Sequence, residues 1–215
     1  MGKVGFAEKE DWVRQKYDRL SGVYDRRWRS YVQSSLHYLL RAIPLEGSET
    51  VLDVACGTGA FETLLMERHE KLRVVGVDVS EKMLSVARSK LETHPRVFLT
   101  RASALVLPFR DESFDLAVCT SALHYFEDPL KFLKEVKRVV KKSGRVVIMD
   151  WCGDDLVTRL RDWVHRIRDL AHHRCCSQKE LRHFLGISGW RVVSEKKFRT
   201  GFLWHMMLTE SVKMD

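Results

Sequence analysis

Apolar segments alternate with amphipathic ones through the middle of the chain, and this alternation constrains the fold more than any other feature. The apolar segments, which read as strands, are residues 51–55, 73–79, 96–100, 114–122 and 144–151. Three of the segments between them, 61–69, 81–91 and 128–142, have the apolar spacing of helices. Strands that are apolar on both faces predict a parallel sheet covered on both sides, in which right-handed crossovers give a doubly wound α/β fold.

Two further regions flank this core. Residues 8–43 have helical spacing and hold many aromatic and arginine side chains. After the core, a helix over 156–171 and another beginning after Ser177 precede two strands, WRVVSEKK and FLWHMMLT. We therefore expect a single domain with a mostly parallel, seven-stranded, Rossmann-like sheet. Its expected parts are a helical cap (1–45), a core (46–151), a helical lid (152–176) and a C-terminal helix with a strand pair (177–215).

Composition and charge narrow the class of protein and of partner. With 45% apolar and 31% charged residues the chain is an ordinary globular one, without an apolar run of the roughly 18 residues that cross a bilayer. The first residues, MGKVGFAEKE, lack the apolar core of a secretory signal, and five cysteines without a CxxC pair indicate reduced thiols. We expect a cytoplasmic protein. The net charge of +8 favours an anionic partner, whether nucleic acid, lipid surface or small molecule.

The stretch VLDVACGTGA (51–60) runs from a strand through a glycine turn, residues 57–59, into a helix. Such a turn at the carboxyl end of a parallel strand lets the backbone approach a ligand. A dinucleotide-binding turn would place a third glycine where Glu62 stands, and a P-loop would need Gly-Lys-Ser/Thr. Asp78 ends the next strand, where a carboxylate can accept both hydroxyls of a ribose. A ribose without a phosphate chain points to S-adenosylmethionine (SAM).

Five motifs resemble those of a known family. They are YDRLSGVYDRRW (17–28), LDVACGTG (52–59), VVGVDVSEKML (74–84), LPFRDESFDLAVCTSALHYFEDP (107–129) and GRVVIMDW (144–151). With these motifs in this order, the chain resembles the class I SAM-dependent methyltransferases, and among them the group that includes the ubiquinone/menaquinone C-methyltransferases. The resemblance implies a Rossmann-like fold, SAM as cofactor and methyl transfer as activity.

The resemblance also implies which residues hold the amino-acid end of SAM. The residues implied at this end are Asp53, Ala55, Gly57 and Gly59. In similar proteins the N-terminal segment closes over SAM and a tyrosine hydroxyl reaches its carboxylate, a role assigned here to Tyr24. From the residues alone, Asp53 could instead cap the turn, and Tyr24 could be an aromatic side chain that packs between helices.

At the nucleoside end, the resemblance implies that Asp78 binds the ribose hydroxyls and that Val79 and Met83 pack against adenine. The family usually has Asp-Ala where this chain has Ser103-Ala104, and the acid accepts from the adenine amino group. A serine accepts only as a neutral group, so we expect a weaker or water-bridged adenine contact. Val79 and Met83 could equally be core residues, and Ser103 could be a plain loop residue.

His124 follows the fourth strand on the ligand side of the sheet and is the candidate catalytic residue. Methyl transfer from a sulfonium is an in-line displacement, which needs a base only if the acceptor must lose a proton. An imidazole suits that role at neutral pH, although His124 could also be structural. The resemblance and the aromatic cap favour a small quinone-like or lipid acceptor. A water-soluble metabolite methylated at nitrogen or oxygen, and SAM binding without catalysis, are the alternatives.

Two segments bear on partners. The first 44 residues carry nine Lys/Arg against five Asp/Glu, interleaved with aromatics, which suits docking at an anionic membrane surface. No RNA-binding module accompanies them, so a nucleic-acid partner is not expected; the oligomeric state is left open.

The lid, 152–176, is expected to face the acceptor. Its helix has one apolar stripe, formed by Leu156, Leu160, Trp163, Val164, Ile167 and Leu170.

The rest of the lid is rich in charged and metal-ligating residue types. Arginines 159, 166 and 168 form a charge run of the kind that is usually a solvated helix face. His172-His173 and Cys175-Cys176 are a tempting ligand set. Because adjacent pairs lack the usual spacing of zinc ligands, we expect no metal.

Overall fold

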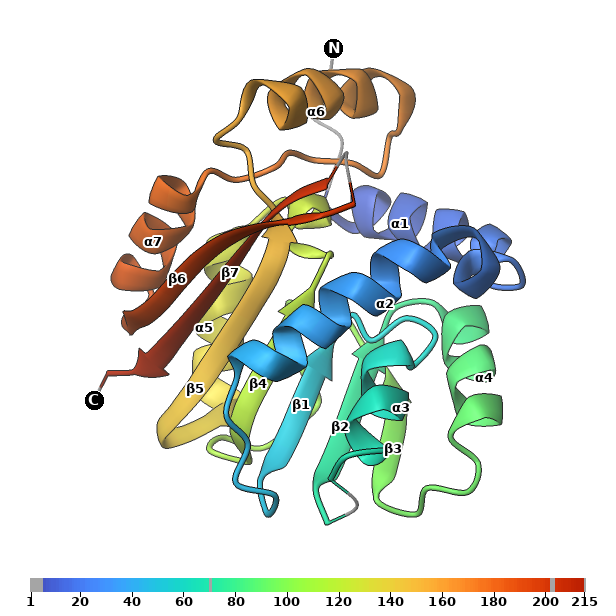
Figure 1. Cartoon of the computed structure of the whole chain (residues 1–215), viewed down its shortest axis with the longest axis vertical. Coiled ribbons are helices and arrows are strands. Elements are labelled where there is room, and N and C mark those ends of the chain that lie inside the picture. The colour runs from blue at the N-terminus through green and yellow to red at the C-terminus, as the bar shows by residue number, and fades with distance from the viewer. Residues whose placement is uncertain (1–5, 70, 202–203, 215) are drawn as a thin grey trace.

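The computed structural model describes residues 6–69, 71–201 and 204–214. Seven strands form one sheet in the order β3-β2-β1-β4-β5-β7-β6 (Figure 1). Their bounds are β1 Thr50–Val54, β2 Arg73–Asp78, β3 Val97–Arg101, β4 Phe114–Thr120, β5 Val140–Trp151, β6 Trp190–Thr200 and β7 Trp204–Lys213. The first five strands pair in parallel and β7 runs antiparallel to β5 and β6. The predicted mostly parallel, doubly wound sheet is confirmed.

Helices cover both faces of the sheet. They are α1 Phe6–Leu20, α2 Tyr24–Ala42, α3 Ala60–Met66, α4 Glu81–Lys90, α5 Pro129–Val139, α6 Leu156–Arg168 and α7 Gln178–Ile187, with a short 3-10 helix, η1 Leu123–Tyr125. Apolar side chains of α2 and α3 pack on one face, and those of α5 and α7 on the other. Among the helices of the described residues, none is both long and apolar enough to span a membrane.

Side chains alternate along β1, so its two faces serve different layers. Leu52 and Val54 belong to the core beneath α5 and α7, whereas Val51 packs with α2 and α3. Asp53 shares the face of Val51 because side chains two residues apart in a strand point the same way. The acid that looked unusual in the strand therefore points toward α3.

Some predicted boundaries are wrong. The helix expected over 128–142 ends at Val139, because Val140 pairs with Phe114 and starts β5. The strand expected to reach residue 122 ends at Thr120, since Ser121 takes a left-handed conformation with φ 53°. The helical block 8–43 is two helices. The first two residues of the predicted strand FLWHMMLT, 202–203, and the first five of the predicted cap lie outside the described residues.

Gly59 shows why the turn after β1 requires glycine at that position. Its φ is +74°, where side chains other than glycine are strained, and it caps the N-terminus of α3. A Cβ there would lie 2.8 Å from Leu91 Cδ1 and 3.0 Å from the Cβ of Ala87. Gly59 therefore serves the close packing of α3 against α4.

We expect Gly59→Ala to lower the free energy of unfolding by about 2–4 kcal/mol, from left-handed strain and overpacking together. Gly186→Ala is the matched control, because Gly186 lies in α7 with nothing within 4 Å of an added Cβ. That change should be neutral or stabilise by up to about 1 kcal/mol. Urea unfolding of both variants measures the difference, and equal stabilities would contradict the packing role of Gly59.

Candidate functional site

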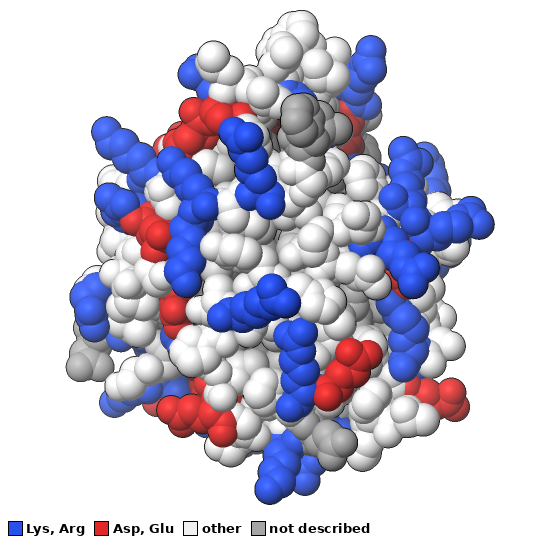
Figure 2. Space-filling view, in the orientation of Figure 1, with Lys and Arg blue, Asp and Glu red and all other residues white. Residues whose placement is uncertain are grey.

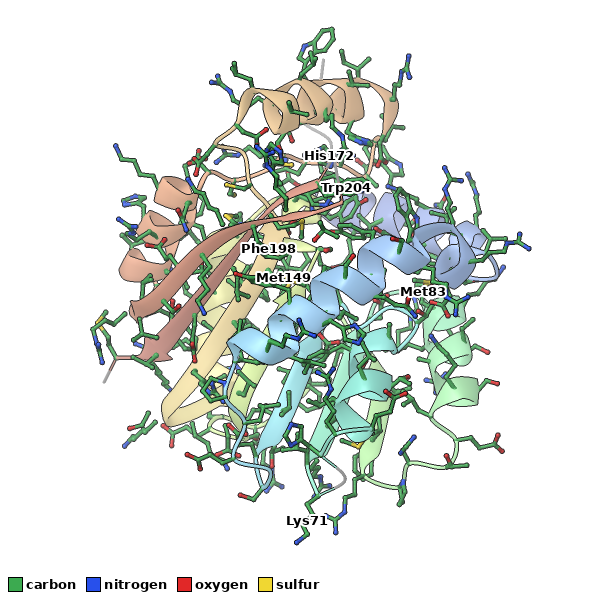
Figure 3. The ribbon with its side chains drawn as sticks, in the orientation of Figure 1. Lys71, Met83, Met149, His172, Phe198 and Trp204 are labelled. Atoms are coloured by element: carbon green, nitrogen blue, oxygen red, sulfur yellow. The ribbon has the colours of Figure 1, made fainter. Side chains whose placement is uncertain are left out.

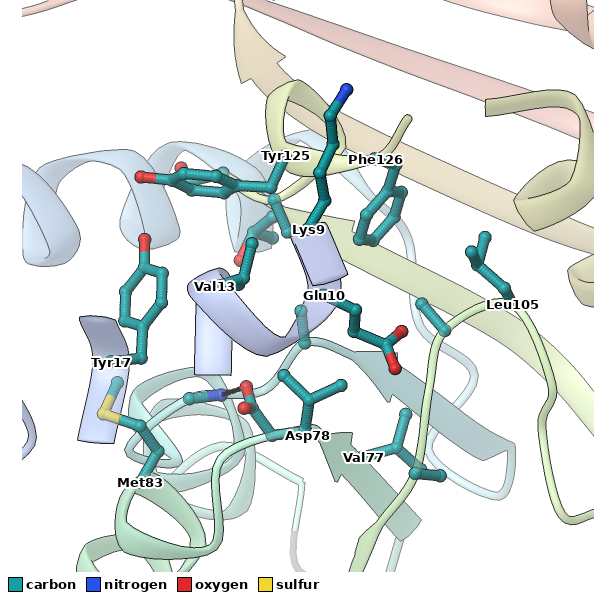
Figure 4. A pocket seen from close by; sticks show the side chains of 18 of the residues that line it. Lys9, Glu10, Val13, Tyr17, Val77, Asp78, Met83, Leu105, Tyr125 and Phe126 are labelled. Carbon is teal, nitrogen blue, oxygen red and sulfur yellow. Dashed lines mark hydrogen bonds between the residues drawn. The ribbon is translucent and has the colours of Figure 1, made fainter. Parts of the chain in front are cut away.

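A cavity of about 860 Å³ opens at the carboxyl ends of β1, β2 and β4, beneath α1 (Figure 4). Seven of the eleven predicted site residues line it: Tyr24, Ala55, Gly57, Asp78, Val79, Met83 and Ala104. Its mixture of apolar walls with a few polar groups is typical of small-molecule sites. The structure thus brings the end of β1, the end of β2 and the start of α2 together around one space.

Asp78 is fixed by two backbone amides at this cavity. Its Oδ2 accepts from the Gly57 N–H at 2.9 Å, and its Oδ1 accepts from the Ser80 N–H at 2.8 Å. Burial raises the pKa of Asp78, while the two amides oppose that shift. Because each carboxylate oxygen has a second lone pair, the side chain can still accept hydrogen bonds from a ligand.

A second carboxyl pair lies under the glycine turn. Asp53, 1% exposed, lines a smaller hollow of about 460 Å³ beside the cavity, and Glu62 of α3 is fully buried next to it. Burial raises the pKa of Glu62 to about 7, and burial with the neighbouring Glu62 raises that of Asp53 well above its usual value. Gly76 faces this pair, and a Cβ there would lie 2.5 Å from Glu62 Oε1. Glycine at 76 leaves the room that the Glu62 carboxyl fills.

Gly59 and Ser103 are two of the four predicted residues that do not line the cavity; the others are Asp53 and His124. Gly59 packs toward α4, as described above. The Ser103 hydroxyl is occupied, because it donates to the carboxylate of Glu10 and accepts from the Leu105 N–H at 3.2 Å. Glu10 comes from α1 and lines the cavity (Figure 4). Where the family usually has an acid, this chain has Ser103, and an acid from the cap contacts it.

Residues that the sequence analysis missed join the cap to the turns after β1 and β2. The Thr58 hydroxyl donates to Asp25 and the Ser80 hydroxyl donates to Asp18, each at 2.6 Å. Both acids follow a tyrosine in the repeated Tyr-Asp pairs of the N-terminal motif. This repeat is the sequence feature that could have identified the two aspartates, because it places them seven residues apart, on successive helices.

Cationic side chains also hold α1 over the cavity. Lys9 pairs with Glu127 at 2.9 Å, and Lys16 donates to the Tyr125 hydroxyl at 2.8 Å and to Asp169 of the lid. Tyr17 lies between Tyr24, which was predicted as a site residue, and Tyr125. Its ring centroid is 5.9 Å from that of Tyr24 and 5.6 Å from that of Tyr125. The three tyrosines line one wall of the cavity.

His124 lies in η1, almost fully buried, outside the lining of the cavity. Its Nδ1 is 2.6 Å from Asp150 Oδ1, and its backbone N–H donates to Asp150 Oδ2. A carboxylate only accepts, so in the neutral ring Nδ1 carries the proton and Nε2 a lone pair. Nε2 has no hydrogen-bond partner among the described residues. The ring stacks on Trp151, with centroids 4.3 Å apart.

An aromatic cluster extends the site from the smaller hollow toward the lid. The Tyr31 hydroxyl shares a 2.6 Å hydrogen bond with Ser121 and accepts from Trp151 Nε1 at 2.9 Å. Trp204 of β7 packs on Tyr31 and Trp151 at 4.9 and 5.0 Å between centroids. Figure 3 shows Trp204 and His172 between the sheet and α6. The rings are tilted against one another, by 50° for Tyr31 and Trp204 and 33° for Trp151 and Trp204, and Tyr31 is the member that lines the smaller hollow.

Strained backbone marks the junction of the two hollows. Ala55 and Ser121 have φ values of 63° and 53°, and both line the cavity and the smaller hollow. Such conformations are unfavourable for residues other than glycine and persist where the surrounding structure enforces them, often at functional sites. The strain lies at the ends of β1 and β4, where a ligand would meet the backbone.

The lid brings together a set of ligand types that the sequence analysis did not group. Asp162, His172 and Cys175 place one ligand atom each within 4.8 Å of the others. The Asp162 carboxylate already pairs with His172 Nε2 at 2.8 Å and accepts from the Cys175 N–H at 2.6 Å. We interpret the group as a hydrogen-bonded anchor of the lid; the predicted absence of a metal stays a prediction.

Comparisons with known proteins agree with the fold. Residues 52–148 match a family model described as "Methyltransferase domain". Demethylmenaquinone methyltransferases of Staphylococcus epidermidis and Thermotoga maritima are each 34% identical, over 64% and 65% of this chain and 56% and 58% of their own length. A SAM-dependent methyltransferase of Aquifex aeolicus is structurally similar, with a TM-score of 0.66, 25% identity and coverage of 83% of this chain and 89% of that one.

The sheet order, the glycine turn and the match of residues 52–148 to a methyltransferase family model are all similar to those of class I SAM-dependent methyltransferase domains. Within that class, the similarity to demethylmenaquinone methyltransferases confirms the resemblance predicted from the five motifs. The chain spans less than two thirds of the length of these curated relatives.

The carboxyl pair under the turn predicts an unusual dependence of stability on pH. A raised pKa means that folded Glu62 keeps its proton between pH 4.5 and about 7, where the unfolded chain releases it. The free energy of unfolding should therefore fall as pH rises through this window. Glu62→Gln should remove up to about 3 kcal/mol of that fall, measured by urea unfolding from pH 4.5 to 8.

Glu92→Gln, at an exposed position, is the control and should leave the pH dependence unchanged. A Glu62→Gln variant with the slope of the parent protein would show that this carboxyl does not hold a proton at neutral pH.

Proposed function

We propose that this chain transfers a methyl group from SAM to a small quinone-like or lipid acceptor. The observation that carries the proposal is the cavity at the carboxyl ends of β1 and β2, where the amides of Gly57 and Ser80 orient the Asp78 carboxylate. A fixed carboxylate beside a glycine turn suits a vicinal diol without phosphates. SAM supplies the sulfonium that donates the methyl group.

The residues present fit the two ends of SAM. At the amino-acid end, Asp53 offers a buried Oδ1 without a partner among the described residues, beside Gly57 and Tyr24. An ammonium group there would favour the ionised carboxylate that burial now opposes. At the nucleoside end, Val79 and Met83 provide apolar walls, and Met83 is 2% exposed.

We assign the adenine amino group to Glu10 rather than to Ser103. The Ser103 hydroxyl donates to the Glu10 carboxylate and so fixes its position in the cavity wall. A carboxylate makes a charge-assisted hydrogen bond to an amino group, which a serine hydroxyl does not. The N-terminal cap thus supplies the acid that the core lacks at position 103.

The acceptor is placed against the aromatic cluster beyond the smaller hollow. Tyr24, Thr120 and Ser121 line both hollows and would surround the point where the methyl group of SAM meets the acceptor. The aromatic side chains of Tyr31, Trp151 and Trp204 suit contact with an apolar aromatic ring. The similarity to demethylmenaquinone methyltransferases supports the same class of acceptor.

His124 is proposed as the base for an acceptor that must lose a proton. The Asp150 carboxylate accepts from Nδ1 at 2.6 Å, and Nε2 has no partner among the described residues. This arrangement orients the ring so that Nε2 is the nitrogen that would accept the proton.

We propose a cytoplasmic location. All five cysteines are free and buried, at positions 56, 119, 152, 175 and 176. Burial raises the pKa of each thiol, for example that of Cys176 to about 12, so these side chains are suited to packing in a reducing compartment.

Asp78 and Glu10 should both contribute to SAM affinity. Asp78→Asn should raise the Kd for SAM by more than about tenfold, and Glu10→Gln by about five- to tenfold, because each removes a charged acceptor. Isothermal titration calorimetry measures both. Glu8→Gln, on the exposed side of α1, is the control. An unchanged Kd in Glu10→Gln would withdraw the adenine assignment while leaving that of Asp78 intact.

The acceptor class is tested with SAM labelled in its methyl group, incubated with the protein and a boiled cell extract. We expect label in the organic phase, with the rate lowered about a hundredfold in His124→Ala and SAM affinity unchanged. Label in the aqueous phase would favour a water-soluble metabolite instead. Bound SAM without transfer to either phase would indicate a non-catalytic SAM-binding protein, and full activity of His124→Ala would make that histidine structural.

A further inference from the structure

The apolar stripe of α6 faces solvent. Five of its members are exposed, Leu156, Leu160, Trp163 and Ile167 in the helix and Leu170 just beyond it, and the neighbouring Val157 is exposed as well, with 47–79% of each residue accessible. Four of them, at positions 156, 160, 163 and 167, follow helical spacing and share one side. In an ordinary surface helix this side would pack on the core.

The opposite side of α6 is polar and faces the protein. Thr158 is the buried residue of this helix, and Asp162 and His165 follow it at helical spacing. Asp162 pairs with His172 and accepts from the Cys175 N–H. These inward contacts fix the orientation of the helix, so the apolar stripe is held outward.

Positive charge borders the stripe on both sides. Arg159 and Arg166, about two helical turns apart, lie on one side of the stripe, and Arg168 lies on the other side. All three are exposed, and none has a carboxylate partner among the described residues. The lid's four acids are paired away from this surface: Asp154 with Lys197, Asp155 with His205, Asp162 with His172 and Asp169 with Lys16.

The helix also has a suitable place in the molecule. Figure 1 shows α6 as the outermost element at the end of the protein where the parallel strands finish, and the cavity opens at those same strand ends. In Figure 2 the surface over α6 is uncharged, with basic side chains to either side. A flat surface that met α6 would thus meet the end of the protein that carries the site.

We propose that α6, with Leu170, docks in the headgroup region of a membrane that contains anionic phospholipids. The stripe would enter the boundary of the acyl chains and the three arginines would contact lipid phosphates. A tryptophan at the centre of the stripe suits this depth. The proposal rests on the proposed function only for its purpose, which is to bring a lipid-soluble acceptor to the site.

Charge favours a membrane over a second copy of the chain as the occupant. Two α6 stripes packed on each other would bring six unpaired arginines together across one small interface. The N-terminal block, where the sequence placed membrane docking, is less suited, because Val23 is the one exposed large apolar side chain among its described residues. We therefore assign docking to α6.

The test is cosedimentation of the full chain with vesicles of phosphatidylcholine, with and without phosphatidylglycerol, in the absence of SAM and acceptor. Leu160→Gln/Ile167→Gln should weaken binding to the anionic vesicles at least about tenfold, because two apolar side chains no longer enter the lipid. Ile187→Gln/Val193→Gln is the matched control, since both residues are exposed apolar positions outside α6. Arg159→Gln/Arg166→Gln/Arg168→Gln should remove the preference for phosphatidylglycerol.

Binding depth gives a second readout. Bromine-labelled lipids should quench the protein's fluorescence, and Trp163→Phe should abolish most of that quenching. No binding of the parent protein at low salt, or equal binding by the α6 and control variants, would overturn the proposal. A concentration-dependent dimer that Leu160→Gln/Ile167→Gln makes monomeric, without vesicle binding, would assign the stripe to a second copy. SAM affinity is measured in parallel, so failure of docking is distinguishable from failure of the proposed function.

Discussion

The hydrogen bonds that Asp78 accepts from the amides of Gly57 and Ser80 are the interaction on which the site depends. One carboxylate joins the turn after β1 to the turn after β2, and so fixes two strand ends and the starts of α3 and α4. The same two turns carry the hydroxyls that hold Asp18 and Asp25 of the cap. A single buried acid thus aligns the sheet, the cavity and the helices that cover it.

Near this acid, the structure tolerates polar groups that an ordinary core would exclude. The carboxyl oxygens of Glu62 and Oδ1 of Asp53 are buried without partners among the described residues. Burying such groups opposes stability unless they are neutralised or paired. Burial raises the pKa of both groups and so favours their neutral forms, and the hollow beside Asp53 leaves room for a cationic group to pair with it. Such departures from local rules of stability are typical of functional sites.

Much of this organisation could be predicted from the sequence because it depends on local patterns. Apolar periodicity predicted the sheet, and spacing after two strands predicted Gly57 and Asp78 at one cavity. Glu10 could not be predicted, because its position depends on how α1 lies over Ser103, a contact across 93 residues. The packing direction of α6 was equally hidden. Periodicity locates a stripe on a helix, but the partners on the other side decide which face is buried.

Hydrogen bonds made by the lid residues after α6 connect this helix to the rest of the site. His173 and Arg174, which follow the lid helix, donate backbone hydrogen bonds to the carbonyl of His124 at 2.9 and 3.1 Å. Lys16 of the cap bridges Asp169 of the lid and the hydroxyl of Tyr125, next to His124. The lid, the cap and η1 are therefore one connected layer over the two hollows. The helix α6, whose outer face carries the apolar stripe, therefore belongs to the same layer that encloses the cavity. A contact made on that outer face would be transmitted through this layer to the site.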